Sequence, residues 1–277
     1  GTMLGGALIQ PAWIDPLVAL GIPFVDSRFE FSIVVVGVLY LIAAAFNFYI
    51  PDTGVDHKVL KNNPIYLLHD FNHCLRLLWR DKLGQISLAV TTLFWGAGAT
   101  LQFIVIKWAE HALHLDLSRA SMLQGVVAVG VAIGAVLAAR LVSLKDSVRV
   151  IPMGIAMGVV VLLMTLVTNA SLAMALMVVV GALAGFFVVP MNALLQHRGH
   201  ILMGAGHSIA VQNFNENLSI LIMTGLYALL IASGLAVNVV IVAFGLFVAV
   251  TMYVIKRLHD ANQRECDSVK LLDDVKH

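Results

Sequence analysis

The sequence predicts an all-α membrane protein, a truncated helical bundle, from its composition and from the length of its apolar stretches. Hydrophobic residues make up 60% of the chain and charged residues 12%, with a mean hydropathy of +0.92. Soluble globular domains typically have about 25% charged residues. An α-helix needs about 20 apolar residues to cross a bilayer. Seven complete spans are expected, at 31–50, 86–106, 120–139, 150–167, 172–195, 205–231 and 235–255.

An eighth apolar stretch, 1–22, is short and interrupted by proline, so it is expected to be a partial span. The chain begins with Gly1 rather than methionine, and its first residues resemble the end of a helix. The sequence is therefore expected to be an internal or truncated piece of a longer product.

Basic residues divide unevenly between the two sets of connections. The connections on one side of the membrane hold only Arg28, Lys107 and Arg119, and those on the other side form a basic set. Because loops rich in Lys and Arg stay in the cytoplasm, the basic set and the C-terminus are predicted to be cytoplasmic. Cys74 and Cys266 then lie on the reducing side, so no structural disulfide is expected. The basic set holds 14 of the 17 Lys and Arg residues: Lys58, Lys61, Arg76, Arg80, Lys82, Arg140, Lys145, Arg149, Arg198, Lys256, Arg257, Arg264, Lys270 and Lys276.

The connection 51–85 is predicted to be a cytoplasmic linker that contains an amphipathic helix. Pro51 ends the preceding span, because the residue before a proline avoids helical geometry. The linker separates 1–50, the end of an N-terminal half, from 86–256, a C-terminal half of six helices, and a polar tail follows at 257–277. Its apolar residues recur at helical spacing, which is typical of a helix at a membrane surface: Ile65, Leu68, Phe71, Leu75, Leu78 and Trp79.

Small residues recur four positions apart in three later spans, and such pairs let helix backbones approach closely. These pairs are Gly130 and Gly134, Gly154 and Gly158, and Gly181 and Gly185. Pro190 removes a backbone hydrogen bond within its span, and we interpret it as either a structural kink or a gating hinge. Arg140, Lys145 and Arg149 follow the third complete span; they either set the topology or contact helix ends as a gate.

Glu216 is the only acidic residue inside a stretch of membrane length. A charged group at that depth is costly unless it faces a bundle interior or a wet cavity. The polar residues around it are more numerous than packing requires, which favours a cavity-lining role over interhelical hydrogen bonding alone. Glu216 is expected to hold a cation, take up a proton, or bond a hydroxyl or ammonium group. Its polar band, by helical spacing, comprises Ser208, Gln212, Asn213, Asn215, Asn217 and Ser219.

Two further pairs of residues are candidates for the wall of such a cavity. Trp95 and Gln102 belong to a stretch rich in small residues, which lets a neighbour or a ligand approach. Gln102 contacts either the ligand or a neighbouring helix. Asn192 and Gln196 lie one turn apart just after Pro190, and they are expected either at the inner mouth or in solvent.

The residue patterns give no support to metal or enzyme chemistry. His69 and His73 have helical ligand spacing, and His111 and His114 lie close to Glu110 and Asp116, but neither pair has a convincing third and fourth ligand. A phosphate-binding glycine-rich loop and a Ser-His-Asp arrangement are also missing from the sequence. We therefore expect no enzyme, no metal site and no cofactor. Three histidines flank one cytoplasmic turn and are expected to be solvated: His197, His200 and His207.

Three strings of residues resemble the bacterial lysophospholipid transporters of the major facilitator superfamily: Leu93–Phe103, Gly185–Gly199 and Gly204–Asn217. The resemblance covers nearly the whole chain. Family members have twelve spans in two halves of six helices, so this chain would run from the end of span five through span twelve. The resemblance implies flipping of lysophospholipids such as lysophosphatidylethanolamine across the bacterial inner membrane. It also implies their reacylation by a cytoplasmic-side acyltransferase/acyl-acyl-carrier-protein synthetase.

Two positions depart from the family's pattern. Gln102 stands where members carry a basic residue thought to meet the headgroup, and His197 stands where they carry glutamate. Gln102 can bond a phosphate but cannot pair with its charge, so the resemblance leaves headgroup preference open. Four positions match the family's string: Gln212, Asn213, Glu216 and Asn217.

Other functions remain open on the residues alone. A narrow polar stripe among apolar helices also suits a proton-coupled exporter of amphipathic drugs, with Glu216 as the proton carrier. A third reading is a truncated membrane module that transports nothing. In a two-half transporter, the site would lie near the midplane and the halves would rock around it.

Overall fold

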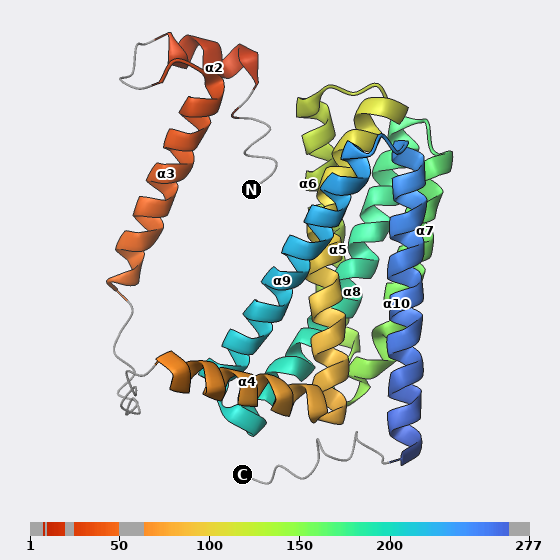
Figure 1. Ribbon diagram of the computed structural model, residues 1–277. Coiled ribbons are helices and arrows are strands. Elements are labelled where there is room, and N and C mark those ends of the chain that lie inside the picture. The colour runs from red at the N-terminus through yellow and green to blue at the C-terminus, as the bar shows by residue number, and fades with distance from the viewer. Residues whose placement is uncertain (1–7, 9, 20–24, 50–63, 266–277) are drawn as a thin grey trace.

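The computed structural model describes residues 8, 10–19, 25–49 and 64–265, and within these ranges the regular structure is helical, with no strand. Seven of the described helices are long and apolar enough to cross a membrane (Figure 1). The prediction of a multi-pass, all-α membrane protein is therefore confirmed. The start of the linker at 51–63 and the end of the tail at 266–277 lie outside the described residues.

The N-terminal part consists of α2 (Pro11–Val18) and α3 (Arg28–Asn47). Ser27 and Glu30 form a capping box that starts α3, and Arg28 Nη2 donates to Asp15 Oδ2 across 3.2 Å, which joins the two helices. None of the residues of α3 is buried, and Figure 1 shows it standing apart from the remaining helices. Of the partial span expected at 1–22, α2 and its neighbours are described and the remainder is not.

The linker helix α4 (Pro64–Arg80) lies across one end of the bundle, which we call the α4 end (Figure 1). Its amphipathic character is as predicted, but the apolar face has two different environments. Cys74 and Leu78 are buried in a small cluster against the bundle, whereas Ile65 is 75% exposed and Leu68 is 70% exposed. One part of the apolar face therefore packs on the bundle, while the part around Leu68 is exposed.

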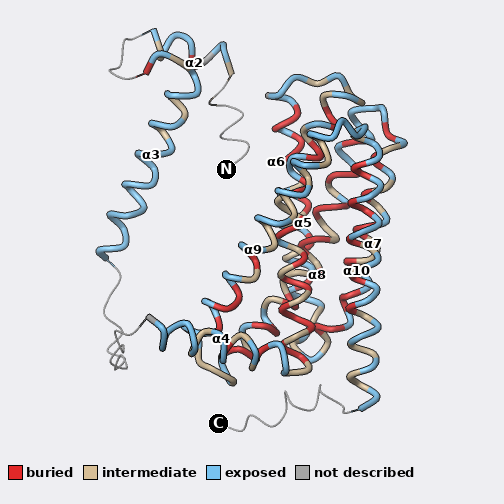
Figure 2. The backbone as a smooth tube through the Cα atoms, in the orientation of Figure 1, coloured by how far each residue is buried: buried red, intermediate tan, exposed pale blue. Residues whose placement is uncertain are grey.

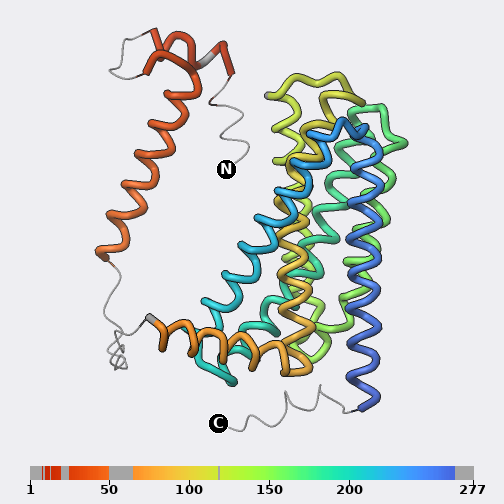
Figure 3. Tube along the Cα trace, in the orientation of Figure 1, coloured from red at the N-terminus to blue at the C-terminus, as the bar shows by residue number. Residues whose placement is uncertain are grey.

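The bundle itself has six spans. Consecutive spans run up and down, as the trace in Figure 3 shows. Gly204, with φ of +82°, forms the tight turn between the fourth and fifth spans of the bundle, a conformation that other residues rarely adopt. The helices are α5 (Lys82–Ala112), α6 (Leu117–Leu141), α7 (Ile151–Leu162) with 3-10 segments η1 (Leu144–Val150) and η2 (Leu163–Leu166) at its ends, α8 (Ala170–Met203), α9 (Ala205–Ala232) and α10 (Val237–Glu265).

Several helices differ from the predicted spans; α8, for example, continues to Met203. The span expected at 150–167 is α-helical from Ile151 to Leu162, with Pro152 in the first turn of α7, and then becomes the 3-10 segment η2. The last helix continues through part of the predicted polar tail to Glu265. Ion pairs support this extension, since Lys256 Nζ lies 3.0 Å from Asp260 Oδ2 and Lys82 Nζ lies 2.9 Å from Glu265 Oε2.

Five of the six paired glycines lie against the backbone of a neighbouring helix, as the sequence predicts, whereas Gly154 meets the Met252 side chain. A side chain at Gly134 would overlap the Ala182 carbonyl of α8, and one at Gly185 would overlap the Val131 carbonyl of α6. Gly158 meets Ala249 of α10 in the same way. Figure 2 shows buried stretches on the helices of the bundle and none on α3. Because lipid tails give helices no hydrophobic reason to associate, such close packing holds the bundle together.

A buried ion pair closes the α4 end. Arg198 of α8 donates from Nε to Asp81 Oδ2 across 3.1 Å and from Nη2 to Asp81 Oδ1 across 2.5 Å. The two side chains are only 8% and 10% exposed. Asp81 also accepts a hydrogen bond of 2.7 Å from the Gly84 amide, which caps α5. A bidentate pair of this kind fixes the α4–α5 corner against α8.

We predict that Gly134→Ala destabilises the bundle by about 1–3 kcal/mol, because the added methyl group must push α6 away from the α8 backbone. Gly225→Ala is the matched control, since nothing lies within 4 Å of that position. It should leave stability unchanged or raise it by up to about 1 kcal/mol through helix propensity. Thermal unfolding in detergent measures both; equal effects of the two substitutions would contradict the proposed backbone contact.

We predict that Asp81→Asn destabilises the protein by about 3–5 kcal/mol, because it leaves the Arg198 guanidinium buried without a counter-charge. Asparagine caps helices as well as aspartate does, so this change isolates the charge. Glu110→Gln, in the exposed Lys107–Glu110 pair, should cost about 0–1 kcal/mol. Denaturation in detergent compares them, and a small effect of Asp81→Asn would mean that solvent reaches Arg198.

Candidate functional site

A hydrogen-bonded cluster of polar side chains joins α8 and α9 inside the bundle. Gln212 Nε2 donates to Glu216 Oε1 and to Asn192 Oδ1, each across 2.8 Å. Gln212 is 8% exposed and Glu216 is 7% exposed. The Glu216 carboxylate therefore faces protein, and Gln212, one turn earlier on α9, holds it there by a hydrogen bond. This orientation is expected, because exposing a carboxylate to lipid is energetically costly.

The contact between α5 and α9 brings Trp95 to the same cluster. The Trp95 side chain, a hydrogen-bond donor only, also interacts with the Glu216 carboxylate. The two helices can approach because Gly96 faces Ser219, where any larger residue would overlap the serine hydroxyl. At Gly96, the absence of a side chain therefore allows α5 and α9 to pack closely.

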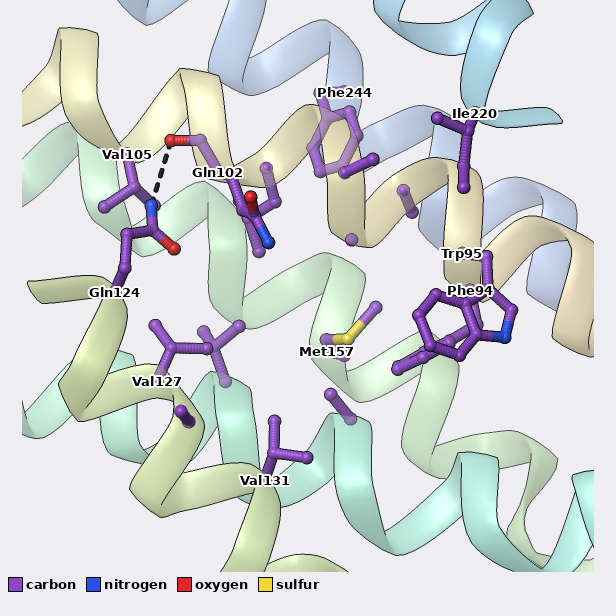
Figure 4. A pocket seen from close by; sticks show the side chains of 17 residues that line it. Phe94, Trp95, Gln102, Val105, Gln124, Val127, Val131, Met157, Ile220 and Phe244 are labelled. Carbon is purple, nitrogen blue, oxygen red and sulfur yellow. Dashed lines mark hydrogen bonds between the residues drawn. The ribbon is translucent and has the colours of Figure 1, made fainter. Parts of the chain in front are cut away.

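A cavity of about 440 Å³ lies beside this cluster, within the bundle (Figure 4). All six spans of the bundle contribute side chains to it, and most of these are apolar, such as Phe94, Val131, Met157 and Phe244. Trp95 lines the cavity as well as contacting Glu216. The arrangement is an apolar chamber with a carboxylate and two amides at its side.

Gln102 and Gln124 are the polar members of the cavity wall. Gln124 Nε2 donates to the backbone carbonyl of Gln102 across 2.9 Å, the dashed line in Figure 4. The Gln102 side chain lines the cavity in its own right. The sequence analysis did not predict Gln124 as a site residue. In the structure Gln124 is buried, with 7% of its surface exposed. The only available signal was one glutamine within the apolar stretch 120–139.

Other predicted site residues lie away from this cluster. Asn213 is exposed beside Asn217 at a shallow groove formed with Phe214, Leu218 and Leu221, outside the cavity. Asn215 donates to the Val211 carbonyl of its own helix across 2.8 Å. Gln196 is exposed on α8. The structure therefore brings together Trp95, Asn192, Gln212 and Glu216, with Gln102 on the same cavity.

The predicted gating residues lie in three different settings. Pro190 is buried, and α8 continues as one helix through it. Arg140 is exposed in the last turn of α6, and Lys145 is exposed in η1. Arg149 pairs with Asp146, with Nη1 and Oδ1 2.8 Å apart. A role in gating stays a prediction for these residues.

Of the three histidines near the turn after α8, His200 and His207 are exposed as expected, and only His197 is less solvated. His197 is half buried, and its Nε2 atom is covered by protein. His207 is exposed, but its Nε2 lies 2.9 Å from Asp70 Oδ2 of α4. The sequence could not place this contact, because it depends on α4 folding back against the first turn of α9.

Comparison with known proteins finds named proteins that are similar in sequence to this chain. "Lysophospholipid transporter LplT" of Pectobacterium carotovorum is 43% identical over 201 residues, which cover 72% of this chain and 49% of that protein. Over this segment, the chain is similar to a protein that carries the name of a lysophospholipid transporter. The protein of the same name from Yersinia pestis is 42% identical, again over 72% of this chain and 50% of its own length.

The chain thus spans about half the length of these transporters. No family model matches it, and no solved structure matches it. The homology agrees with the family resemblance seen in the three sequence strings. The names of the relatives describe a transporter rather than an enzyme.

Proposed function

We propose that this chain binds a lysophospholipid and takes part in its transport across the bacterial inner membrane. The observation that carries the proposal is the apolar cavity of about 440 Å³ beside the buried Glu216 cluster. A lysophospholipid has one acyl chain, which needs an apolar chamber, and a polar headgroup, which needs hydrogen-bond partners. The names of the homologous transporters support the same substrate class.

In this proposal the acyl chain enters the cavity and the headgroup lies at the polar cluster. Glu216 would accept hydrogen bonds from an ammonium or hydroxyl group, and Asn192 and Gln212 would complete its partners. The Gln102 amide, as a neutral donor, would bond the phosphate. Trp95 lies at the junction, since it lines the cavity and also interacts with Glu216.

The charge of the site favours a zwitterionic headgroup. None of the described residues that line the cavity is basic, so a phosphate bound there finds no cationic side chain in the wall. An ethanolamine headgroup carries its own positive charge, which Glu216 complements. An anionic glycerol headgroup lacks that charge. We therefore infer a preference for lysophosphatidylethanolamine over lysophosphatidylglycerol.

Transport in this proposal follows alternating access, with two halves rocking around a site near the membrane midplane. The boundaries 1–50, 51–85, 86–256 and 257–277 remain the proposed division of the chain. The delivered lipid would be reacylated by a cytoplasmic-side acyltransferase/acyl-acyl-carrier-protein synthetase. A lysophospholipid is a suitable substrate for that reaction, because it keeps one free hydroxyl that can take a second acyl group.

A lysophosphatidylethanolamine with a brominated acyl chain tests the binding site, because bromine quenches indole fluorescence on contact. The purified chain should show saturable quenching, and Trp95→Phe should remove most of it. Glu216→Ala should weaken binding about tenfold or more, the value of a lost charged hydrogen bond. Thr224→Val is the control, since Thr224 bonds the Ile220 carbonyl of its own helix.

The same titration separates the alternative functions. Displacement of the lipid by amphipathic cations, with little preference for lysolipid, would favour a drug exporter. Quenching that does not saturate, or that is equal in Trp95→Phe, would mean that the cavity takes no lysolipid and that the chain is a non-transporting module. Stronger binding of lysophosphatidylglycerol would reject the inferred headgroup preference.

We predict that the α4 end and the C-terminus face the cytoplasm, because the basic residues of the described spans gather at that end. Single cysteines at Gly234 and Arg264, in a background without Cys74 and Cys266, test this with an impermeant thiol reagent. The cysteine at 234 should react in sealed cells and the one at 264 only after lysis. Labelling of position 264 from outside would reverse the topology.

A further inference from the structure

The structure brings together three potential metal ligands that are far apart in the sequence. Asp70 and Cys74 lie one turn apart on the same face of α4, and His207 lies in the first turn of α9. A carboxylate oxygen of Asp70, the Cys74 thiol sulfur and a ring nitrogen of His207 all lie within 4.8 Å of one another. His207 Nε2 lies 2.9 Å from Asp70 Oδ2.

We propose that Asp70, Cys74 and His207 form a site for Zn²⁺ that joins the linker helix α4 to α9. The proposal does not depend on the proposed lipid transport. Thiolate, imidazole and carboxylate are the side chains that bind Zn²⁺, and a set of three leaves one position for water. In tetrahedral coordination these ligand atoms would be roughly 3.3–3.6 Å apart, a separation that follows from the usual Zn–ligand bond lengths. The 2.9 Å between His207 Nε2 and Asp70 Oδ2 lies just below that range and no two of the three atoms are more than 4.8 Å apart, so the ligand atoms lie near the spacing that the metal requires.

The identity of the donors selects the metal. A thiolate disfavours Mg²⁺ and Ca²⁺, which bind oxygen, and favours Zn²⁺ among the common divalent ions. Burial, and next the charge of Asp70, raises the pKa of the Cys74 thiol, so the sulfur carries its proton before a metal arrives. Binding would then form the Zn–S bond and release that proton to solvent.

The surroundings provide both access and support. Cys74 is 5% exposed, whereas the side chains of Asp70 and His207 are 38% and 54% exposed, so an ion can enter from their side. The Phe71 and Phe214 rings pack edge to face, with centroids 5.2 Å apart, and hold α4 against α9 next to the site. A bound ion would tie the start of α9 to the linker. Gln212 and Glu216 follow on the same helix.

The test uses the full chain without a polyhistidine tag, in detergent, with Cys266→Ser as the background and bound metal removed by a chelator. Co²⁺ is the spectroscopic probe, because thiolate ligation produces a charge-transfer absorption. We expect that band and its loss on adding Zn²⁺, with one Zn²⁺ retained per chain after dialysis. Cys74→Ser should abolish the band, and His207→Ala should weaken Zn²⁺ binding about tenfold or more.

His73→Ala is the matched control, because His73 is exposed on α4 next to Cys74 and lies outside the cluster. It should leave the band and the stoichiometry unchanged. His207→Ala keeps the test informative if Cys74→Ser fails to fold, since more than half of the His207 side chain is exposed. Zinc should also slow alkylation of Cys74. Absence of the band, or Zn²⁺ binding equal in His207→Ala, would reduce the cluster to a hydrogen bond between Asp70 and His207.

Discussion

The structure depends on one constraint, that a polar group within hydrocarbon must find its partners inside the protein. Glu216 is the sharpest case, because a carboxylate in the lipid-facing wall would be very costly. Its hydrogen bond from Gln212, and that residue's bond to Asn192, fix which face of α9 turns toward α8 and α5. The same constraint explains the Gln124 bond to the Gln102 carbonyl across α5 and α6. The polar side chains thus set the rotation of the helices around the cavity.

The cavity and the tight seams are two results of the same small-residue chemistry. Gly134 and Gly185 bring the α6 and α8 backbones into contact, and Gly158 does the same for α7 and α10. These seams form firm walls, because backbone atoms cannot move aside as side chains can. Where α5 presents Gly98 and α6 presents Ala128 to the space between the helices, a cavity remains. Firm walls around an apolar chamber are what the proposed binding of an acyl chain would require.

The α4 end concentrates the charged contacts of the protein. Asp81 at the α4–α5 corner binds Arg198 at the end of α8, and Asp70 binds His207 at the start of α9. The linker helix therefore contacts both helices that carry the polar cluster, α8 through Asn192 and α9 through Glu216. A change in the position of α4 would be transmitted to the site, and a metal at Cys74 would restrict that change.

The sequence by itself determined the fold class and the approximate positions of the spans, and it singled out Glu216. Long apolar stretches have only one stable form in a bilayer, so helix positions followed from hydropathy, and the cost of a buried carboxylate marked Glu216. The sequence could not show that Asn213 and Gln196 lie outside the cluster. Helical spacing predicts which side chains share one face of a helix, but it does not predict which other helix packs against that face. Gln124, the Arg198–Asp81 pair and the Asp70–Cys74–His207 group were also out of reach. Each joins residues on different helices, and only the packing of those helices decides which side chains meet.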